Sequence, residues 1–391
     1  MSATTRVLLV VGGMNRGGIE TWLMDVARAL DPADVELTFL EHTPEECHFD
    51  AEIRRLGHRV VVCPSPHSPL GYAVRLRRIL RREGPFDAIH SFVSTFSAVP
   101  LSVARTAGVP VRVAHSQTDR RSVIAAAGPA RRAYARAASA VLVRAMTAGV
   151  ACSEEASLFL FRRPPSTDPR IRVVPNGIDI TRFREATGVL RTELGVPERT
   201  LLVGHVGRFV PVKNHPLLVD VARVWVERGD AVHLVLVGDG PDRTAIASRV
   251  TRAGLGRRVT LTGARDDIPE VMADLDVLVL PSHYEGAPIT LVEAQASGVP
   301  CVVSAAVSTA SDVVPGLLER MGPDADADDW ARRVLEVAAR PRPSREVAQQ
   351  AMAASPWALP EVLASLREVW SGATPARVRH TASIGEPMDR G

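Results

Sequence analysis

The sequence predicts an α/β fold built from two parallel-sheet domains. At 391 residues the chain is longer than one ordinary hydrophobic core supports. Hydrophobic residues make up 46% of it but aromatic residues only 4%, which is typical of aliphatic parallel sheets covered by helices. Short apolar runs alternate with amphipathic stretches, and this alternation starts twice. We therefore expect two Rossmann-like domains.

Seven apolar runs in the first half predict strands, with helices in most of the gaps between them. The strands are expected at Val7–Val11, Val35–Leu40, Arg59–Cys63, Ala88–Ser91, Arg112–His115, Gly149–Cys152 and Arg172–Val174. The turn cluster Pro175–Asp179 then predicts the exit from a first domain that spans residues 1–183.

The pattern restarts in a second domain, which we place at residues 184–355. Its strands are expected at Leu201–Val206, His233–Val237, Thr260–Thr262, Val277–Leu280 and Cys301–Val303. A helix at 356–371 is expected to pack back toward the first domain. The tail 372–391 is polar and aperiodic, which predicts disorder.

Composition excludes several classes of protein. Four cysteines without close pairing (Cys47, Cys63, Cys152 and Cys301) indicate a reduced protein without a metal cluster. No segment approaches the ~18 consecutive apolar residues of a membrane-spanning helix. The first eleven residues lack the pattern of a secretion signal. We expect a cytoplasmic protein, at most peripheral at the inner face of the membrane.

Arginine is concentrated in the first domain. Residues 66–150 contain thirteen Arg, no Lys and three acidic residues, with clusters at 75–82 and 131–136. The region 75–136 could contact an anionic membrane or a polyprenyl-phosphate acceptor. A solvated helix face is the equally plain alternative. Nucleic acid is disfavoured because aromatic residues do not interleave with the arginines.

Two carboxylates mark the most informative segment. Glu285 follows the predicted strand Val277–Leu280, at the sheet edge where open α/β sheets bind ligands. Pro288 opens a helical pattern, and Glu293 lies about two turns into it. The free N–H groups at the helix start suit a phosphate. Two hydroxyl-binding acids around an anion site describe a nucleotide-sugar pocket, although the spacing alone could arise by chance.

A glycine-rich loop, Gly12–Gly18, follows the first strand and precedes a helix that starts near Ile19. Such a loop lets the backbone approach an anion closely. Its spacing is not that of a dinucleotide-binding fingerprint. Glu41, at the end of the second strand, is therefore expected at the surface and not on a ribose.

Two cations, Arg208 and Lys213, share the loop after Val206. They could close on both groups of a diphosphate, or they could be ordinary surface charges. Gly238 could line a nucleotide or only make a turn. His90 and His115 end strands at the same sheet edge, where a structural role is the alternative.

Several of these segments resemble one family. The string 285–304 resembles the signature segment of the retaining glycosyltransferases with two facing Rossmann-like domains and a cleft between them (the GT-B fold). These are family 4, or glycosyl transferases group 1. Residues 15–21, 207–214 and the segment around His115 resemble the same family, and the likeness is greatest to bacterial exopolysaccharide-type members. Two departures are Gln117, where the family has a second His, and Ala305–Ala306, where the subgroup often has an acidic residue.

The resemblance implies a role for each residue. Glu285 would hold hydroxyls of the donor sugar, and Glu293 would hold the ribose. Arg208 and Lys213 would stabilise the leaving nucleoside diphosphate, and His115 would contact the sugar or the reaction centre. The other donor-binding residues would be Gly17, Gly18, Gly238, Ile268, Thr290 and Leu291.

The implied reaction moves a hexose, with retention, from a UDP-sugar, or secondly a GDP-sugar, to a glycan or lipid-linked saccharide in envelope or exopolysaccharide synthesis. No cofactor, metal or nucleic acid is expected. The alternatives are a non-catalytic nucleotide-sugar binding protein and a sugar-nucleotide epimerase on the same fold.

Overall fold

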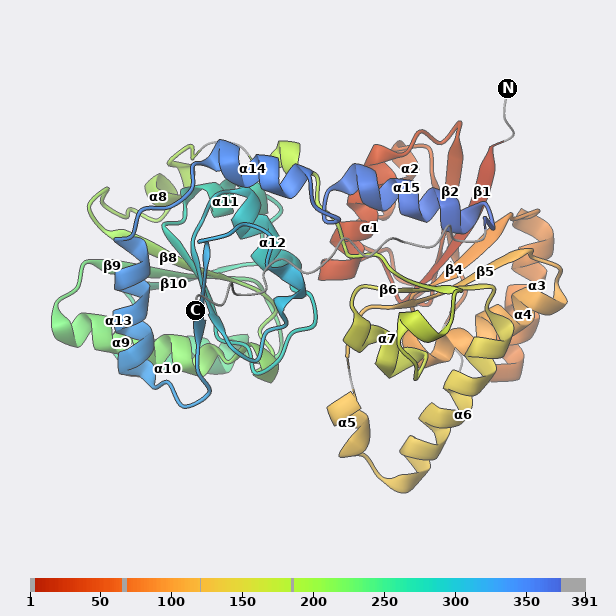
Figure 1. Cartoon of the computed structure of the whole chain (residues 1–391), viewed down its shortest axis with the longest axis horizontal. Coiled ribbons are helices and arrows are strands. Elements are labelled where there is room, and N and C mark those ends of the chain that lie inside the picture. The colour runs from red at the N-terminus through yellow and green to blue at the C-terminus, as the bar shows by residue number, and fades with distance from the viewer. Residues whose placement is uncertain (1–3, 65–68, 120, 184–185, 374–391) are drawn as a thin grey trace, which may run out of the picture.

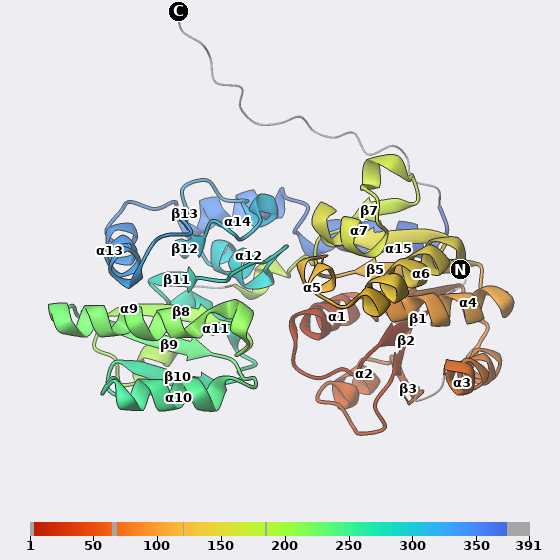
Figure 2. The same cartoon turned by 90° about the horizontal axis from the view of Figure 1, so that it is seen from below.

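The computed structural model describes residues 4–64, 69–119, 121–183 and 186–373. It contains two parallel sheets, each covered by helices, which lie beside each other (Figures 1 and 2). The predicted α/β class with two Rossmann-like domains is therefore confirmed.

The first sheet has seven parallel strands in the order β3-β2-β1-β4-β5-β6-β7. Its strands are β1 Thr5–Val11, β2 Val35–Glu41, β3 Arg59–Val62, β4 Ala88–Ser91, β5 Val111–Ser116, β6 Ala148–Ala151 and β7 Ile171–Val173. Its helices are α1 Gly18–Ala29, α2 Asp50–Arg55, α3 Pro69–Glu83, α4 Ala98–Thr106, α5 Arg121–Ala125, α6 Pro129–Ala145 and α7 Glu154–Leu160, with 3-10 turns η1 Ser94–Ser97, η2 Pro165–Thr167 and η3 Ile180–Arg182. The central strand β1 is buried on both faces from Val7 to Val11, as its continuous apolar run predicts.

The second sheet has six parallel strands in the order β10-β9-β8-β11-β12-β13. Its strands are β8 Leu201–Val206, β9 Val232–Val237, β10 Val259–Gly263, β11 Val277–Leu280, β12 Cys301–Ser304 and β13 Leu318–Met321. Its helices are α8 Val189–Glu193, α9 His215–Arg228, α10 Arg243–Arg252, α11 Ile268–Asp274, α12 Ile289–Ala296, α13 Ala327–Ala338 and α14 Arg345–Ala353, with turns η4 Pro211–Lys213 and η5 Thr309–Ser311. The edge strand β13 was not predicted because its sequence, Leu-Glu-Arg-Met, has no apolar run.

Both sheets reverse their strand order beside the first strand of the domain. The chain adds β2 and β3 on one side of β1 and then places β4 on the other side; β9, β10 and β11 repeat this around β8. In open α/β sheets, ligands bind outside the carboxyl ends of the strands at such a reversal. The two switch points lie between β1 and β4 and between β8 and β11.

The last helix, α15 Leu359–Trp370, returns to the first domain (Figure 1). Its apolar face joins the core of β1, α1 and β5, where Leu366 and Trp370 are almost fully buried. The chain therefore crosses between the domains twice, and the two crossings pair: Ile178 N–H donates to Trp357 O at 2.9 Å. Residues 184–185 lie outside the described residues, and so do residues 374–391 of the tail 372–391 that we predicted to be disordered.

Within the described part of the chain, the longest apolar helices are too short or too polar to cross a bilayer.

Candidate active site between the two domains

The loops at the two switch points meet across the domains. A Cβ on Gly18, at the start of α1, would lie 4.0 Å from Cδ1 of Ile289, at the start of α12. A Cβ on Gly286 would lie 3.6 Å from Oγ of Ser153, which caps α7. Two helix N-termini from opposite domains thus meet at one place. Their partial positive charges and free N–H groups favour an anion there.

The first turn of α12 can bind a ligand through backbone N–H groups, but not through the side chain of Leu291. Leu291 is fully buried in the core, so its side chain cannot reach a ligand in this structure. Its N–H donates to Pro288 O at 3.1 Å. The N–H groups of Ile289 and Thr290 have no hydrogen-bond acceptor among the described residues.

Lys213 and Glu285 come together at the second switch point. Lys213 Nζ lies 2.5 Å from Glu285 Oε1, and both side chains are largely buried. From the sequence we expected Lys213 to bind the diphosphate and Glu285 to bind the donor sugar, but we did not predict that the two side chains would form an ion pair. The pair fixes both side chains at the carboxyl ends of β8 and β11.

Arg208 differs from Lys213. Its side chain is exposed, and its guanidinium has no hydrogen-bond partner in the described part of the chain. Its charge acts on Glu20 in the first domain, whose pKa it lowers. Arg208 is therefore free to bind an added anion.

Gly238 has a structural reason to be glycine. Its φ is +136°, and a Cβ there would collide with the carbonyl oxygen of Gly207. The turn after β9 thus packs directly on the backbone that carries Arg208. This close approach requires a glycine whether or not a nucleotide binds.

Glu293 lies on the face of α12 that is turned toward α1. Burial and, to a smaller extent, the negative charge of Asp25 raise the pKa of its carboxyl group to about 7, against the opposing charge of Arg182. Asp25 is occupied by Arg28 at 2.9 Å and by Arg182 at 2.8 Å. The Glu293 carboxyl group itself has no hydrogen-bond donor among the described residues. Hydroxyl groups of a ligand would supply what it lacks.

Glu20 is a site residue that the sequence reasoning missed. Its carboxylate folds back over Gly17, where a Cβ would collide with it. Burial raises the pKa of Glu20, while its own backbone N–H and the charge of Arg208 lower it. The sequence signal that could have identified Glu20 is its position as an acidic residue in the first turn of α1.

His115 is held in a chain of hydrogen bonds that begins on α15. The Trp370 Nε1–H donates to His90 Nδ1 at 3.2 Å, and His90 Nε2 lies 3.1 Å from His115 Nδ1. Burial lowers the pKa of His90 to about 3 and that of His115 well below its usual range, so both rings are neutral. Because indole can only donate, His90 must carry its proton on Nε2 and donate to His115.

The same reasoning fixes the proton of His115 on Nε2. That atom is buried without a partner among the described residues, and the imidazole ring packs against the rings of Trp22 and Phe92. His115 is therefore a neutral hydrogen-bond donor. Gln117, which replaces a family His, is tied instead to Asn176 in the turn that leaves the first domain, at 3.0 Å.

The expectation that Glu41 lies at the surface was wrong. Its side chain is completely buried and accepts the N–H of Met14 at 2.7 Å, so it supports the glycine-rich loop from below. Its carboxylate lies near Cys47 and Asp50, with ligand-type atoms within 4.8 Å of one another. Asp50 in turn accepts the N–H of Cys47 at 3.2 Å. The sequence failed here because strand-end position does not report burial.

The loop before Ile268 bridges the domains. Asp266 accepts a two-pronged hydrogen bond from Arg16, and His48 Nε2 lies 3.5 Å from it. Arg265 is held by Glu193 and Asp267. The loop before Ile268, a predicted donor-binding residue, therefore also links the second domain to the first.

Comparisons with known proteins agree with this architecture. The family described as "Glycosyltransferase Family 4" matches residues 16–182, and "Glycosyl transferases group 1" matches residues 188–353. The putative glycosyltransferase EpsF of Bacillus subtilis is 35% identical over 367 residues, which cover 90% of this chain and 92% of that relative.

A second relative is named for its reaction. The UDP-Gal:alpha-D-GlcNAc-diphosphoundecaprenol alpha-1,3-galactosyltransferase of Escherichia coli is 31% identical over 245 residues, 59% of this chain and 60% of that protein. Among solved structures, HepE of Anabaena in complex with UDP and glucose is similar with a TM-score of 0.74 at 20% identity, covering 94% of this chain and 99% of that one.

Proposed function

The chain belongs to the family 4, group 1 glycosyltransferases of the GT-B type, and from this premise we propose that it is a retaining hexosyltransferase that uses a UDP-sugar. GDP is the second candidate for the donor nucleotide. The acceptor is a glycan or lipid-linked saccharide of envelope or exopolysaccharide synthesis. The observation that carries the proposal is the Lys213–Glu285 pair, opposite the start of α1 and beside the free Arg208.

The donor would lie between the two helix N-termini. Its diphosphate would meet the N–H groups of Ile289 and Thr290, with Gly17 and Gly18 opposite. Glu293 would accept from the ribose hydroxyls, which would satisfy its carboxylate. Gly238 and Ile268 would flank the nucleotide through their backbones.

The reaction would proceed by attack on the same face that the leaving group departs from. The bond between the sugar C1 and the diphosphate oxygen breaks while the acceptor oxygen bonds to C1, and the acceptor proton passes to the leaving phosphate. Arg208 and Lys213 would stabilise the charge on that phosphate, which is the largest single contribution in such chemistry. Glu285 would position the sugar hydroxyls. The His115 Nε2–H is buried in this structure, so its donation to the sugar would require the side chains that cover it to move.

We also propose peripheral contact with an anionic membrane through α3. Leu70 and Val74 are 81% and 61% exposed on this helix, and Arg77, Arg78 and Arg81 follow on the same exposed surface. An exposed apolar pair next to cations that have no ion-pair partner among the described residues suits a lipid interface. Flotation with phosphatidylglycerol vesicles should carry the wild type upward, and an Arg77→Ala/Arg78→Ala variant should stay behind.

A thermal-shift screen against UDP, GDP, dTDP and ADP and their common sugar conjugates tests the donor site. A ligand that binds only the native state raises the melting temperature. We expect one nucleotide to stabilise the wild type and Glu361→Ala, a control at an exposed site on α15, but not Glu293→Ala. No shift with any diphosphate at saturation would refute the proposed donor site.

Product analysis separates the alternatives. A transferase should release the nucleoside diphosphate slowly by donor hydrolysis, and Arg208→Ala should lose this release. A binding protein would bind the donor without turnover. An epimerase would return a sugar of changed configuration.

A further inference from the structure

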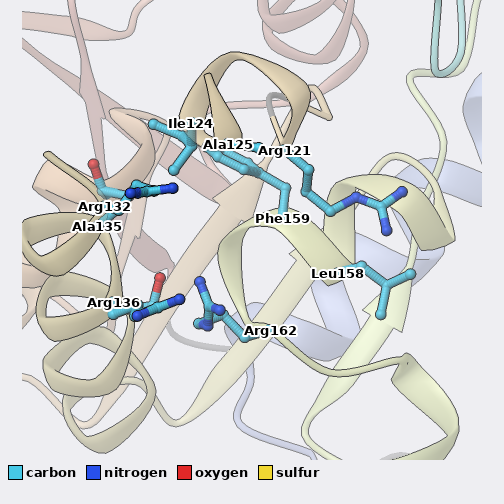
Figure 3. A pocket seen from close by; sticks show the side chains of 11 residues that line it. Arg121, Ile124, Ala125, Arg132, Ala135, Arg136, Leu158, Phe159 and Arg162 are labelled. Carbon is cyan, nitrogen blue, oxygen red and sulfur yellow. The ribbon is translucent and has the colours of Figure 1, made fainter. Parts of the chain in front are cut away.

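A cavity lies within the first domain, away from the donor site. It has a volume of about 430 Å³ and opens between η1, α5, α6 and the end of α7 (Figure 3). Its lining consists of Thr95, Arg121, Ile124, Ala125, Arg132, Ala135, Arg136, Ser139, Leu158, Phe159 and Arg162. None of these residues belongs to the donor site described above.

Three arginines in this cavity lack a counter-charge. Arg132 and Arg136 extend from α6, and Arg162 extends from the residue pair after α7 toward the same space (Figure 3). Among the described residues, none of the three has a carboxylate or other hydrogen-bond partner for its side chain. Arg121, on the same rim, is different: it pairs with Asp119 at 2.8 Å. The cavity therefore carries uncompensated positive charge.

Three features of the local structure make these arginine positions unfavourable for stability. Arg132 lies in the first turn of α6, close to the positive end of the helix dipole, and this turn contains no acidic residue that would offset the charge. Arg132 and Arg136 are four residues apart, a spacing at which like charges repel on a helix. Arg162 has φ +59°, the left-handed region that favours glycine. Local choices that oppose stability and meet at one cavity indicate a functional site.

The rest of the lining defines the chemistry of the ligand. Guanidinium forks bind phosphate oxygens in pairs, and Thr95 and Ser139 add hydroxyl groups. Ile124, Leu158 and Phe159 form an apolar wall beside the arginines. A group with two phosphates joined to a hydrocarbon chain matches both halves of this surface.

The position of the cavity relates it to the reaction centre. Ser153, which caps helix α7, faces Gly286 of the second domain, whereas Leu158 lies in the last turn of this helix and Arg162 lies two residues beyond its end. The seven residues of the helix correspond to about 10 Å. A diphosphate in the cavity would therefore leave room for a short saccharide to reach the donor sugar.

We propose that this cavity binds the diphosphate of a lipid-linked saccharide, the acceptor of the transfer reaction. The proposal rests on the proposed function and adds the acceptor class and its binding residues to it. The contact of α3 with the membrane is separate, because α3 contributes no residue to the cavity.

Binding of farnesyl diphosphate, measured by calorimetry with the full-length chain, tests the proposal. The measurement uses an Arg208→Ala/Lys213→Ala background, which removes the competing cations of the donor site. Arg132→Ala and Arg136→Ala should each weaken binding about tenfold, as expected for loss of one charged hydrogen-bonding group. Arg131→Ala is the matched control: it removes the same charge from the same helix turn but does not line the cavity, and it should change the Kd less than twofold.

Two further ligands identify what the cavity recognises. Farnesol should not bind, and inorganic diphosphate should bind more weakly than farnesyl diphosphate but with the same dependence on Arg132 and Arg136. Equal losses in Arg131→Ala and Arg132→Ala would overturn the proposal in favour of nonspecific charge. Unchanged binding in both cavity variants, at an unchanged melting temperature, would also overturn it.

Vesicles and donor hydrolysis separate the remaining explanations. The proposal is wrong if the protein does not bind farnesyl diphosphate but binds vesicles of phosphatidylcholine with phosphatidylglycerol in a way that requires Arg132 and Arg136. In that case the cavity is a membrane contact. If the wild type binds farnesyl diphosphate through these arginines but never hydrolyses a sugar nucleotide, the proposed function fails and the diphosphate site stands. If it hydrolyses the donor but the cavity variants bind normally, only the acceptor site fails.

Discussion

Donor binding should depend on pH through Glu293, and Glu293→Gln should remove that dependence. In the free protein, burial and the charge of Asp25 raise the pKa of this carboxyl group to about 7. Ribose hydroxyls can donate hydrogen bonds to both oxygens of a carboxylate. The protonated acid accepts fewer hydrogen bonds, because one of its oxygens carries the proton. The bound state therefore favours the ionised form, and affinity should rise as the pH rises through 7.

The expected magnitude follows from the shift. If hydroxyl donors return the pKa of bound Glu293 to its ordinary value of 4.5, binding at pH 5.5 should be about 25-fold weaker than at pH 8, or ~2 kcal/mol. Arg182, which already lowers the pKa of the free form, makes this an upper estimate.

Calorimetry with UDP-glucose between pH 5.5 and 8 is the assay, because its diphosphate has no terminal phosphate that titrates in this range. Glu293→Gln should give a nearly flat profile. Stability provides a check without ligand: a carboxyl pKa that is raised in the folded state makes stability fall as the pH rises from 4.5 to about 7. Glu293→Gln should lose that fall. A wild-type affinity that is constant across this range would refute the reasoning.

Three further changes test other parts of the molecule. Lys213→Ala should lower kcat at least 100-fold and leave the Glu285 carboxylate unpaired, so adding Glu285→Gln should recover melting temperature but not turnover. Arg162→Gly should relieve the left-handed backbone and stabilise the protein by about 1 kcal/mol, while the KM for a lipid-linked acceptor rises about tenfold; a lower melting temperature would contradict the strain argument. Trp370→Phe should cost about 1 kcal/mol and free His90 to change tautomer, visible as altered imidazole ¹⁵N shifts of both histidines; unchanged shifts would show that the indole does not set the proton positions.

Much of the architecture could be predicted because parallel strands buried on both faces leave continuous apolar runs in the sequence. Val277–Leu280 and Leu201–Val206 were predicted with their observed bounds. The edge strand β13, with one buried residue, leaves no such run and was missed. The loop position of Glu285 and the helix position of Glu293 also followed from local pattern, since a strand end and a proline at a helix start are local signals.

What the sequence by itself determined is which segments form strands and helices, and therefore which side chains stand at the ligand edge of each sheet. The tertiary structure decided which of them meet. Lys213 and Glu285 pair because β8 and β11 are neighbours in the sheet although 72 positions separate the two residues. The proton of His115 is set by Trp370, which reaches it only because α15 returns to the first domain. Arg162 joins Arg132 and Arg136 because α7 ends beside α6. Local periodicity shows which face of a helix or strand is buried, whereas these contacts depend on packing between distant elements, which no local pattern contains.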